Sequence, residues 1–212
     1  MNTQSSVNLW DSAEHALEYL RRADSIPHRV EGEATLLEFL PSGAGRILDL
    51  GSGGGRLLAL AKSARPGARF VGLDFSTTML EKLLKSFAGD PGVEIVAHNF
   101  ENPLPAMGRF DAVISSFAIH HVSHPRKRAL YAEVFAALAP RGVFCNLEHV
   151  SSPTDRLHVE FRRAISWEEE DPSNKLLDLE TQLAWLREIG FVDVDCHWKW
   201  RELALFAGTK PS

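Results

Sequence analysis

A cluster of glycines between a short apolar segment and a helical segment constrains this chain more than any other feature of its sequence. Residues 46–50 read Arg-Ile-Leu-Asp-Leu, and glycine follows at positions 51, 53, 54 and 55. Glycine has no Cβ atom and tolerates positive φ angles, so a ligand can approach the backbone closely at such positions. In open α/β sheets, loops of this kind lie at the carboxyl ends of the strands, where ligands bind. The segment therefore predicts a ligand site at the first turn from strand to helix.

Strands and helices alternate after this point. The expected strands are residues 46–50, 69–74, 93–97, 110–115 and 143–147, and the expected helices between them are 57–64, 76–87 and 125–139. This alternation predicts a doubly wound α/β sheet that is mostly parallel, with right-handed crossovers. The apolar interiors of the strands favour helices on both faces of the sheet.

The end of the chain departs from the alternation. After an expected helix over residues 179–189, the strand-like segments 191–198 and 202–208 are separated by only three residues. Such a connection is too short for a crossover between parallel strands. We therefore expect an antiparallel hairpin at the C-terminal edge of the sheet.

Composition excludes several classes of protein. The chain has 212 residues, of which 44% are hydrophobic and 24% charged, and its formal net charge is −5. This is typical of one soluble globular domain. The mild acidity argues against a broad contact with nucleic acid, which needs a basic face. No apolar run approaches the roughly 20 residues of a membrane span, and the N-terminus lacks the apolar core of a signal peptide. We expect a cytoplasmic protein.

Two classes of cofactor could occupy the glycine loop. A dinucleotide needs the spacing G-x-G-x-x-G, but Arg56 stands three positions after Gly53, so this spacing fails. The pattern D-x-G-x-G-x-G is present instead over residues 49–55. This pattern resembles the first motif of the class I S-adenosylmethionine (SAM) dependent methyltransferases, in which the loop cradles the amino-acid end of SAM. The loop by itself could also be a tight turn in another Rossmann-like protein.

Further motifs extend the resemblance. Residues 71–76 look like the second motif of the family, with Asp74 for the ribose hydroxyls and Phe75 beside the adenine. Residues 97–105 look like the third motif, although Asn99 stands where the family often has an aspartate. Residues 110–122 and 138–144 resemble the fourth motif and the loop before the fifth strand, and the terminal hairpin is also characteristic of the family.

The resemblance implies a Rossmann-like fold and a cofactor. It implies that SAM binds, and that S-adenosyl-L-homocysteine forms as the product. The residues expected to hold the cofactor are Asp49, Gly51, Ser52, Gly53, Gly55, Asp74, Phe75, Asn99, Phe100 and Ser115.

The chain is expected to form a single methyltransferase domain over residues 1–212. Residues 1–40 would be an N-terminal helical cover, and residues 45–150 the SAM-binding core. Residues 151–178 would be a covering insertion, and residues 179–212 the last helix and the terminal hairpin.

Methyl transfer from a sulfonium is an in-line displacement, so positioning of the acceptor is the main requirement. A general base helps only if the acceptor atom carries a proton. The candidate bases lie just after the fourth and fifth strands: His120 and His121, and Glu148 and His149. The two adjacent histidines could instead only supply backbone atoms beside SAM.

The acceptor would lie under the N-terminal helices and the covering insertion. Side chains there that could contact a small molecule are Trp10, Tyr19, Arg22, Arg29, His158, Phe161, Arg162 and Trp167, although each is also an ordinary helix-face residue. A metal is not expected, because His120, His121 and His124 have no carboxylate or fourth ligand at useful spacing.

The favoured function is methyl transfer to oxygen or nitrogen of a small molecule. RNA or protein methylation remains an alternative, although residues 115–117 read Ser-Ser-Phe rather than the motif of base-N methylases. A non-catalytic SAM-binding module of the same fold is a further alternative. A nicotinamide-dependent oxidoreductase is disfavoured by Arg56 and the hairpin. The sequence leaves both a monomer and a homodimer open.

Overall fold

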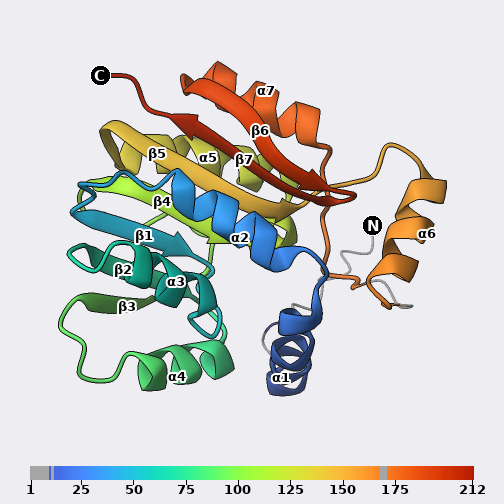
Figure 1. Ribbon diagram of the computed structural model, residues 1–212, viewed down its shortest axis with the longest axis horizontal. Coiled ribbons are helices and arrows are strands. Elements are labelled where there is room, and N and C mark those ends of the chain that lie inside the picture. The colour runs from blue at the N-terminus through green and yellow to red at the C-terminus, as the bar shows by residue number, and fades with distance from the viewer. Residues whose placement is uncertain (1–9, 11, 168–170) are drawn as a thin grey trace, which may run out of the picture.

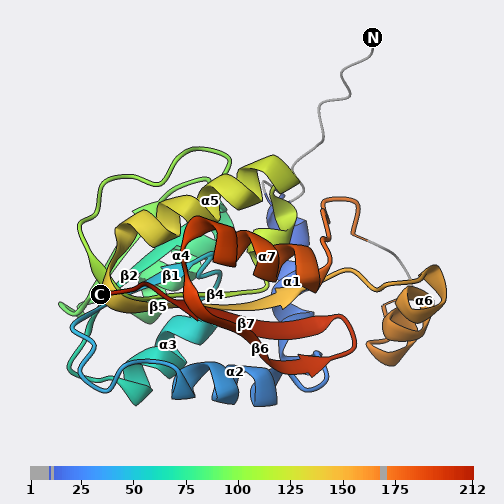
Figure 2. The ribbon, with the colours of Figure 1, turned by 90° about the horizontal axis from the view of Figure 1, so that it is seen from above.

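A seven-stranded sheet runs through the middle of the molecule, and helices pack on both of its faces (Figures 1 and 2). The computed structural model describes residues 10, 12–167 and 171–212. The strand order is β3-β2-β1-β4-β5-β7-β6. The strands are β1 (Arg46–Leu50), β2 (Arg69–Asp74), β3 (Val93–Ala97), β4 (Phe110–Ser116), β5 (Leu138–His149), β6 (Val192–Trp200) and β7 (Leu203–Thr209).

Helices cover both faces of the sheet, and further helices lie past the ends of its strands (Figures 1 and 2). The helices are α1 (Ala13–Arg22), α2 (Arg29–Glu38), α3 (Arg56–Ala64), α4 (Thr77–Ser86), α5 (His124–Ala137), α6 (Asp155–Ala164) and α7 (Leu179–Ile189), with 3₁₀ turns η2 (Ala23–Ser25) and η3 (Ile119–His121). Helices α5 and α7 cover one face of the sheet, and α2 and α3 cover the other (Figure 2). None of the helices in the described part of the chain has the length and apolar character that crossing a bilayer requires.

The first five strands are parallel, as the alternation of strands and helices predicts. Apolar side chains bury both faces of these strands: β1 places Ile47 in the core beneath α3, and Leu48 and Leu50 in the core beneath α5. The order reverses between β1 and β4, because β1 pairs with β2 on one side and with β4 on the other. A reversal of this kind opens a crevice at the carboxyl ends of the strands.

The predicted C-terminal hairpin is present, and its second strand lies inside the sheet. Strand β7 pairs antiparallel with both β5 and β6, so β6 becomes the edge. Pairing of β6 with β7 shifts register twice, between Val192 and Asp195 and again between Cys196 and Trp198. Strand β5 also begins earlier than predicted, at Leu138, because this residue already pairs with Phe110 before the register shift in β4.

The region expected to be helical over residues 8–40 forms two separate helices, α1 and α2. Helix α1 ends at Arg22 and helix α2 begins at Arg29, with η2 and Pro27 between them. His28, directly before α2, has a φ angle of 61°, so the chain turns sharply there. This turn lets α2 pack on the sheet while α1 lies past the carboxyl ends of the parallel strands (Figure 1).

Candidate active site

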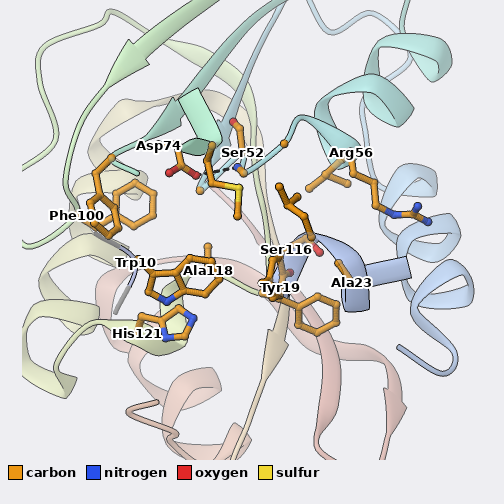
Figure 3. A pocket seen from close by; sticks show the side chains of 18 of the residues that line it. Trp10, Tyr19, Ala23, Ser52, Arg56, Asp74, Phe100, Ser116, Ala118 and His121 are labelled. Atoms are coloured by element: carbon orange, nitrogen blue, oxygen red, sulfur yellow. Dashed lines mark hydrogen bonds between the residues drawn. The ribbon is translucent and has the colours of Figure 1, made fainter. Parts of the chain in front are cut away.

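A cavity of about 770 Å³ lies at the carboxyl ends of the parallel strands, where their order reverses. Asp74 and Ser52 lie on one side of it, and Trp10 and His121 on the other (Figure 3). The glycine loop forms part of the wall, and the N-terminal region covers the cavity with Trp10, Tyr19, Leu20 and Ala23. Pockets of this volume typically hold a cofactor or a small organic molecule.

The glycine loop has a backbone that only glycine accommodates at two points. At Gly51 the φ angle is 72°, and an added Cβ would lie 2.2 Å from the Cβ atom of Ala118. At Gly55 the φ angle is 90°, and an added Cβ would lie 2.8 Å from the side chains of Leu83 and Phe87. The amides of Gly51 and Ser52 both donate to the carbonyl of Leu73, at 2.9 and 2.8 Å. The loop is therefore held against the end of β2.

Gly53 differs from the other two glycines with positive φ in this loop. Its φ angle is 52°, but an added Cβ would meet only the Met79 sulfur, at 3.9 Å. Gly53 lines the cavity, so the space beside its Cα is available to a ligand. The glycine at this position therefore permits close approach of a ligand rather than close packing of the protein.

Asp74 connects the loop to the cavity. One carboxylate oxygen accepts a hydrogen bond from the amide of Gly53 at 2.8 Å, and the other accepts one from the amide of Ser76 at 3.0 Å. Burial raises the pKa of Asp74 above its usual value, although these amide bonds act in the opposite direction. Each oxygen keeps a further lone pair, which can accept a hydrogen bond from a ligand hydroxyl.

Asp49, another expected cofactor residue, is a buried carboxylate that does not itself line the cavity. Its side chain is 1% exposed, and neither oxygen has a hydrogen-bond partner among the residues that the structure describes. The Ser52 hydroxyl donates to the Asp49 backbone carbonyl instead, at 3.1 Å. Burial raises the pKa of Asp49 to about 7, and the charge of Asp74 adds to this, although the nearby Ser52 side chain acts in the opposite direction. A cationic group bound beside the loop would stabilise the ionised form.

The other expected cofactor residues divide into two groups. Phe75, Asn99 and Phe100 line the cavity, and the Asn99 side-chain oxygen accepts a hydrogen bond from the amide of Glu101 at 2.9 Å. Ser115 does not line the cavity: it is fully buried, and its hydroxyl donates to the carbonyl of Leu50 at 2.8 Å. The neighbouring residue, Ser116, lines the cavity instead.

Of the four candidate bases, His121 lines the cavity and the other three do not. His120 contacts Glu148, with 2.6 Å between its Nδ1 atom and a carboxylate oxygen. His149 contacts Glu202, with 2.8 Å between its Nε2 atom and a carboxylate oxygen. These side chains belong to two buried polar networks behind the cavity wall. The geometry therefore reduces four candidates to one that can face a ligand.

One ring nitrogen of His121 forms no hydrogen bond with the described residues of the protein. The Nδ1 atom lies 3.0 Å from the hydroxyl of Ser173, while Nε2 is buried and has no hydrogen-bond partner within the described ranges of the chain. The Trp10 ring packs against it in a T-shaped contact, with 5.0 Å between the ring centroids. Burial, with His120 beside it, holds the pKa of His121 well below its usual range. The imidazole is therefore neutral near pH 7 and can accept a proton.

The cover of the cavity matches the expectation only in part. Trp10, Tyr19 and Arg29 line the cavity, although Arg29 is already bonded to Glu33 at 2.8 Å. Arg22 does not line it and forms an exposed ion pair with Glu18. Residues of the expected insertion that were candidates for acceptor contact also lie outside the lining: His158, Phe161, Arg162 and Trp167.

Helix α6 packs against the terminal hairpin instead of over the cavity. His158 contacts Glu202 at 3.0 Å, and the ring of Phe161 lies 6.1 Å from that of Trp200. The lining comes from the segment that follows α6, with Pro172, Ser173 and Lys175. Sequence reasoning missed these three residues, because the segment has no helical or strand periodicity that would orient it.

The histidines after β4, which could have suggested a metal site, make separate contacts with the protein. His124 turns away to the carbonyl of Leu176, with 3.1 Å between that oxygen and Nε2. Within the part of the chain that the structure describes, no group of three or more His, Cys, Asp or Glu side chains is placed to hold a metal ion.

The fold and the cavity define a Rossmann-like protein with a ligand site at the reversal of strand order. Residues 47–142 match the family described as a methyltransferase domain. A demethylmenaquinone methyltransferase of Clavibacter sepedonicus is 33% identical over 180 residues, which cover 76% of this chain and 71% of that protein. A carboxy-S-adenosyl-L-methionine synthase of Helicobacter hepaticus is 27% identical over 206 residues, and the match covers 83% of each chain.

A solved structure shows the same fold. The O-methyltransferase family protein from Burkholderia thailandensis has a TM-score of 0.76 and 16% sequence identity, and the match covers 96% of this chain and 62% of that one. This chain therefore spans less than two thirds of that protein. Together, the sequence matches and the fold show that the chain belongs to the class I SAM-dependent methyltransferases. Its cofactor is SAM, and the open space beside Gly53 and the buried carboxylate of Asp49 at the base of the loop fit that cofactor.

Proposed function

We propose that the protein transfers a methyl group from SAM to an oxygen or nitrogen atom of a small-molecule acceptor. The observation that supports this most directly is that one cavity has two walls of different chemistry. One wall has the glycine loop and Asp74, and the other has aromatic side chains and His121 (Figure 3). A volume of about 770 Å³ leaves room for an acceptor beside a cofactor.

The residues of the first wall would hold the cofactor. Asp74 can accept hydrogen bonds from ribose hydroxyls. Gly53 has no side chain, so ligand atoms can lie next to the backbone of the loop. The rings of Phe75 and Phe100 also line the cavity, where they can stack on a planar base. When bound, SAM supplies a methyl group already activated by a sulfonium sulfur.

The residues of the second wall would hold the acceptor and exclude water. Trp10 and Tyr19 come from the N-terminal region, and Pro172 from the segment before α7. Large apolar side chains of this kind remove the acceptor from water and restrict its orientation, which is the main requirement for a displacement reaction. The enclosure under α1 supports a small acceptor rather than a macromolecule, and the net charge of −5 argues against RNA.

The test combines binding with turnover. Calorimetry should show saturable binding of SAM, and incubation with a panel of small hydroxyl and amine compounds should release S-adenosylhomocysteine with at least one of them. A methylated product from an RNA or protein substrate alone would overturn the small-molecule assignment. SAM binding without turnover across the whole panel would indicate a non-catalytic module of the same fold.

The affinity for SAM is expected to rise with pH through about 7, with release of a proton on binding. Asp49 is protonated below its raised pKa of about 7, whereas a cationic ligand beside the loop stabilises the carboxylate. Binding therefore lowers the pKa of Asp49 and displaces its proton on the acidic side of pH 7. Calorimetry at pH 6 in buffers of different ionisation enthalpy measures this release, and Asp49→Asn should abolish it. An equal proton release in that variant would exclude Asp49 as the source.

A further inference from the structure

Ser173 contacts His121 from the segment that connects α6 to α7, and Asp171 contacts Ser173. We propose that Ser173 and Asp171 form a hydrogen-bonded relay that fixes His121 in the Nδ1–H tautomer. The Nε2 atom is then the group that takes a proton from the methyl acceptor. Ser173 and Asp171 would act as positioning residues, and His121 as the catalytic residue. The role of Nε2 rests on the proposed function, whereas the tautomer is a property of the free protein.

The number of available protons determines the direction of each hydrogen bond. One Asp171 oxygen lies 2.7 Å from the Ser173 hydroxyl and 2.8 Å from the Ser173 amide. An ionised carboxylate only accepts hydrogen bonds, so the single hydroxyl proton of Ser173 points to Asp171. The Ser173 oxygen can then only accept from His121, whose Nδ1 atom lies 3.0 Å away. Neutral imidazole carries one N–H, so a proton on Nδ1 leaves a lone pair on Nε2.

The His121 ring lies in the cavity wall (Figure 3), and its Nε2 atom is covered, with the ring of Trp10 packed against the imidazole. Nε2 is buried and unpaired among the described residues, so the protein does not itself use the lone pair. An unpaired buried acceptor costs free energy unless a ligand satisfies it. A hydroxyl or protonated nitrogen on an acceptor that displaces the Trp10 ring would form this missing hydrogen bond.

The relay is held in place from several sides. The second oxygen of Asp171 lies 3.4 Å from Nε2 of His15 on α1. The ammonium group of Lys175 donates to the backbone carbonyl of His121 at 2.8 Å. Ser173 itself is buried. These contacts therefore link three elements around the imidazole ring of His121: helix α1, the segment before α7 and the turn η3.

The proton and the charge are balanced in the transfer step. The acceptor oxygen or nitrogen forms a bond to the methyl carbon, and its proton moves to Nε2 of His121. The bond from methyl to sulfur breaks, and its electron pair stays on the sulfur. The sulfonium loses its positive charge, and the imidazolium of His121 gains one. Ser173 and Asp171 stabilise this imidazolium.

Charged and titratable groups face His121 from every element packed around it. They are His120 in η3, Glu148 in β5, Asp171 and Lys175 in the segment before α7, and, through Asp171, His15 in α1. His120 lowers the pKa of His121, and Asp171 and Glu148 raise it, while burial has the largest effect and lowers it. Removal of Asp171 is therefore expected to lower the pKa of His121 further.

Nitrogen-15 NMR of the histidine-labelled full chain tests the tautomer without cofactor or acceptor. The chain has nine histidines, and the signals of His121 are those that disappear in His121→Asn. In the wild type at neutral pH we expect Nδ1 to be protonated and Nε2 to have the shift of an unprotonated nitrogen. A predominantly Nε2–H tautomer in the wild type would overturn the proposal.

Three substitutions test the relay, and each variant should be confirmed as folded by thermal unfolding. In Asp171→Ala the serine hydroxyl is free to donate to Nδ1, so the Nε2–H tautomer should appear and the titration midpoint of His121 should move to lower pH. In Ser173→Ala both tautomers should be populated, and Ser173→Thr, which keeps the hydroxyl, should restore the single tautomer. Unchanged His121 signals in both alanine variants would contradict the relay.

A matched serine provides the control. Ser152 donates its hydroxyl to Glu202, which also contacts His149 and His158 and forms no hydrogen bond with His121 in the described part of the chain. Ser152→Ala should leave the His121 signals as they are in the wild type. Failure of methyl transfer would not alter the tautomer, and failure of the relay would not alter SAM binding, so the two outcomes remain distinguishable.

Discussion

Gly53→Val is expected to lower the affinity for SAM by about 100-fold, or roughly 2.8 kcal/mol. The added side chain would project into the space beside the loop, where the protein offers only the Met79 sulfur at 3.9 Å. The valine methyl groups would then occupy volume that the cofactor needs. The variant should still fold, because no backbone atom clashes with the new Cβ. Calorimetry with SAM measures the loss.

Backbone strain must be separated from the steric effect on the ligand. Valine at a positive φ angle costs on the order of 1–3 kcal/mol in folding, whether or not a ligand is near. Gly89 supplies the control, because its φ angle is 78° and an added Cβ meets nothing within 4 Å. Gly89→Val should lose similar stability in denaturant unfolding and keep the wild-type affinity. Wild-type SAM binding by Gly53→Val would place the cofactor elsewhere.

His121→Asn is expected to lower kcat by at least about 100-fold with an acceptor that must lose a proton. The affinity for SAM should change by only a few-fold, since the first wall of the cavity stays intact. Asparagine is chosen because its amide can still donate to Ser173, so the variant removes Nε2 while it preserves the contact with the covering segment. Single-turnover kinetics and calorimetry measure the two quantities separately.

His197→Asn is the matched control for that substitution. His197 lies in the edge strand β6 and packs on Phe39, with 4.2 Å between the ring centroids. It does not line the cavity, so kcat should remain that of the wild type. If His121→Asn retained full turnover, the reaction would need no base at this position, and the acceptor would react in an already deprotonated form.

The parallel core and the loop at its centre could be predicted because their signals are local. The boundaries of β1, β2 and β3 agree with the apolar segments that suggested them. The loop is recognisable because positive φ angles and close approach require glycine at specific positions, such as Gly51 and Gly55. The C-terminal hairpin was predictable because a three-residue connection cannot span a crossover.

The orientation of side chains could not be predicted where both faces of a strand are buried. Alternation in β4 distinguishes Ser115 from Ser116 only when one face is polar, and here helices cover both faces. The sequence placed Ser115 at the cofactor, whereas Ser116 lines the cavity.

Partners that are distant in the chain explain the remaining differences. Glu202, which lies 53 residues after His149, engages both this histidine and His158. No local sequence pattern predicts such a contact. His149 and the segment of α6 were therefore predicted to be parts of the site. The relay to His121 has the same character, since Ser173 lies 52 residues away from it.

The unpaired edge of strand β6 affects how copies of this protein associate with one another. Its exposed side chains include Asp193, Asp195, His197 and Lys199. An unpaired strand normally offers a template on which another chain can add in continuous register. Here charge and two interruptions of register break that template. We expect concentrated protein to resist cross-β growth and fibril formation along this edge.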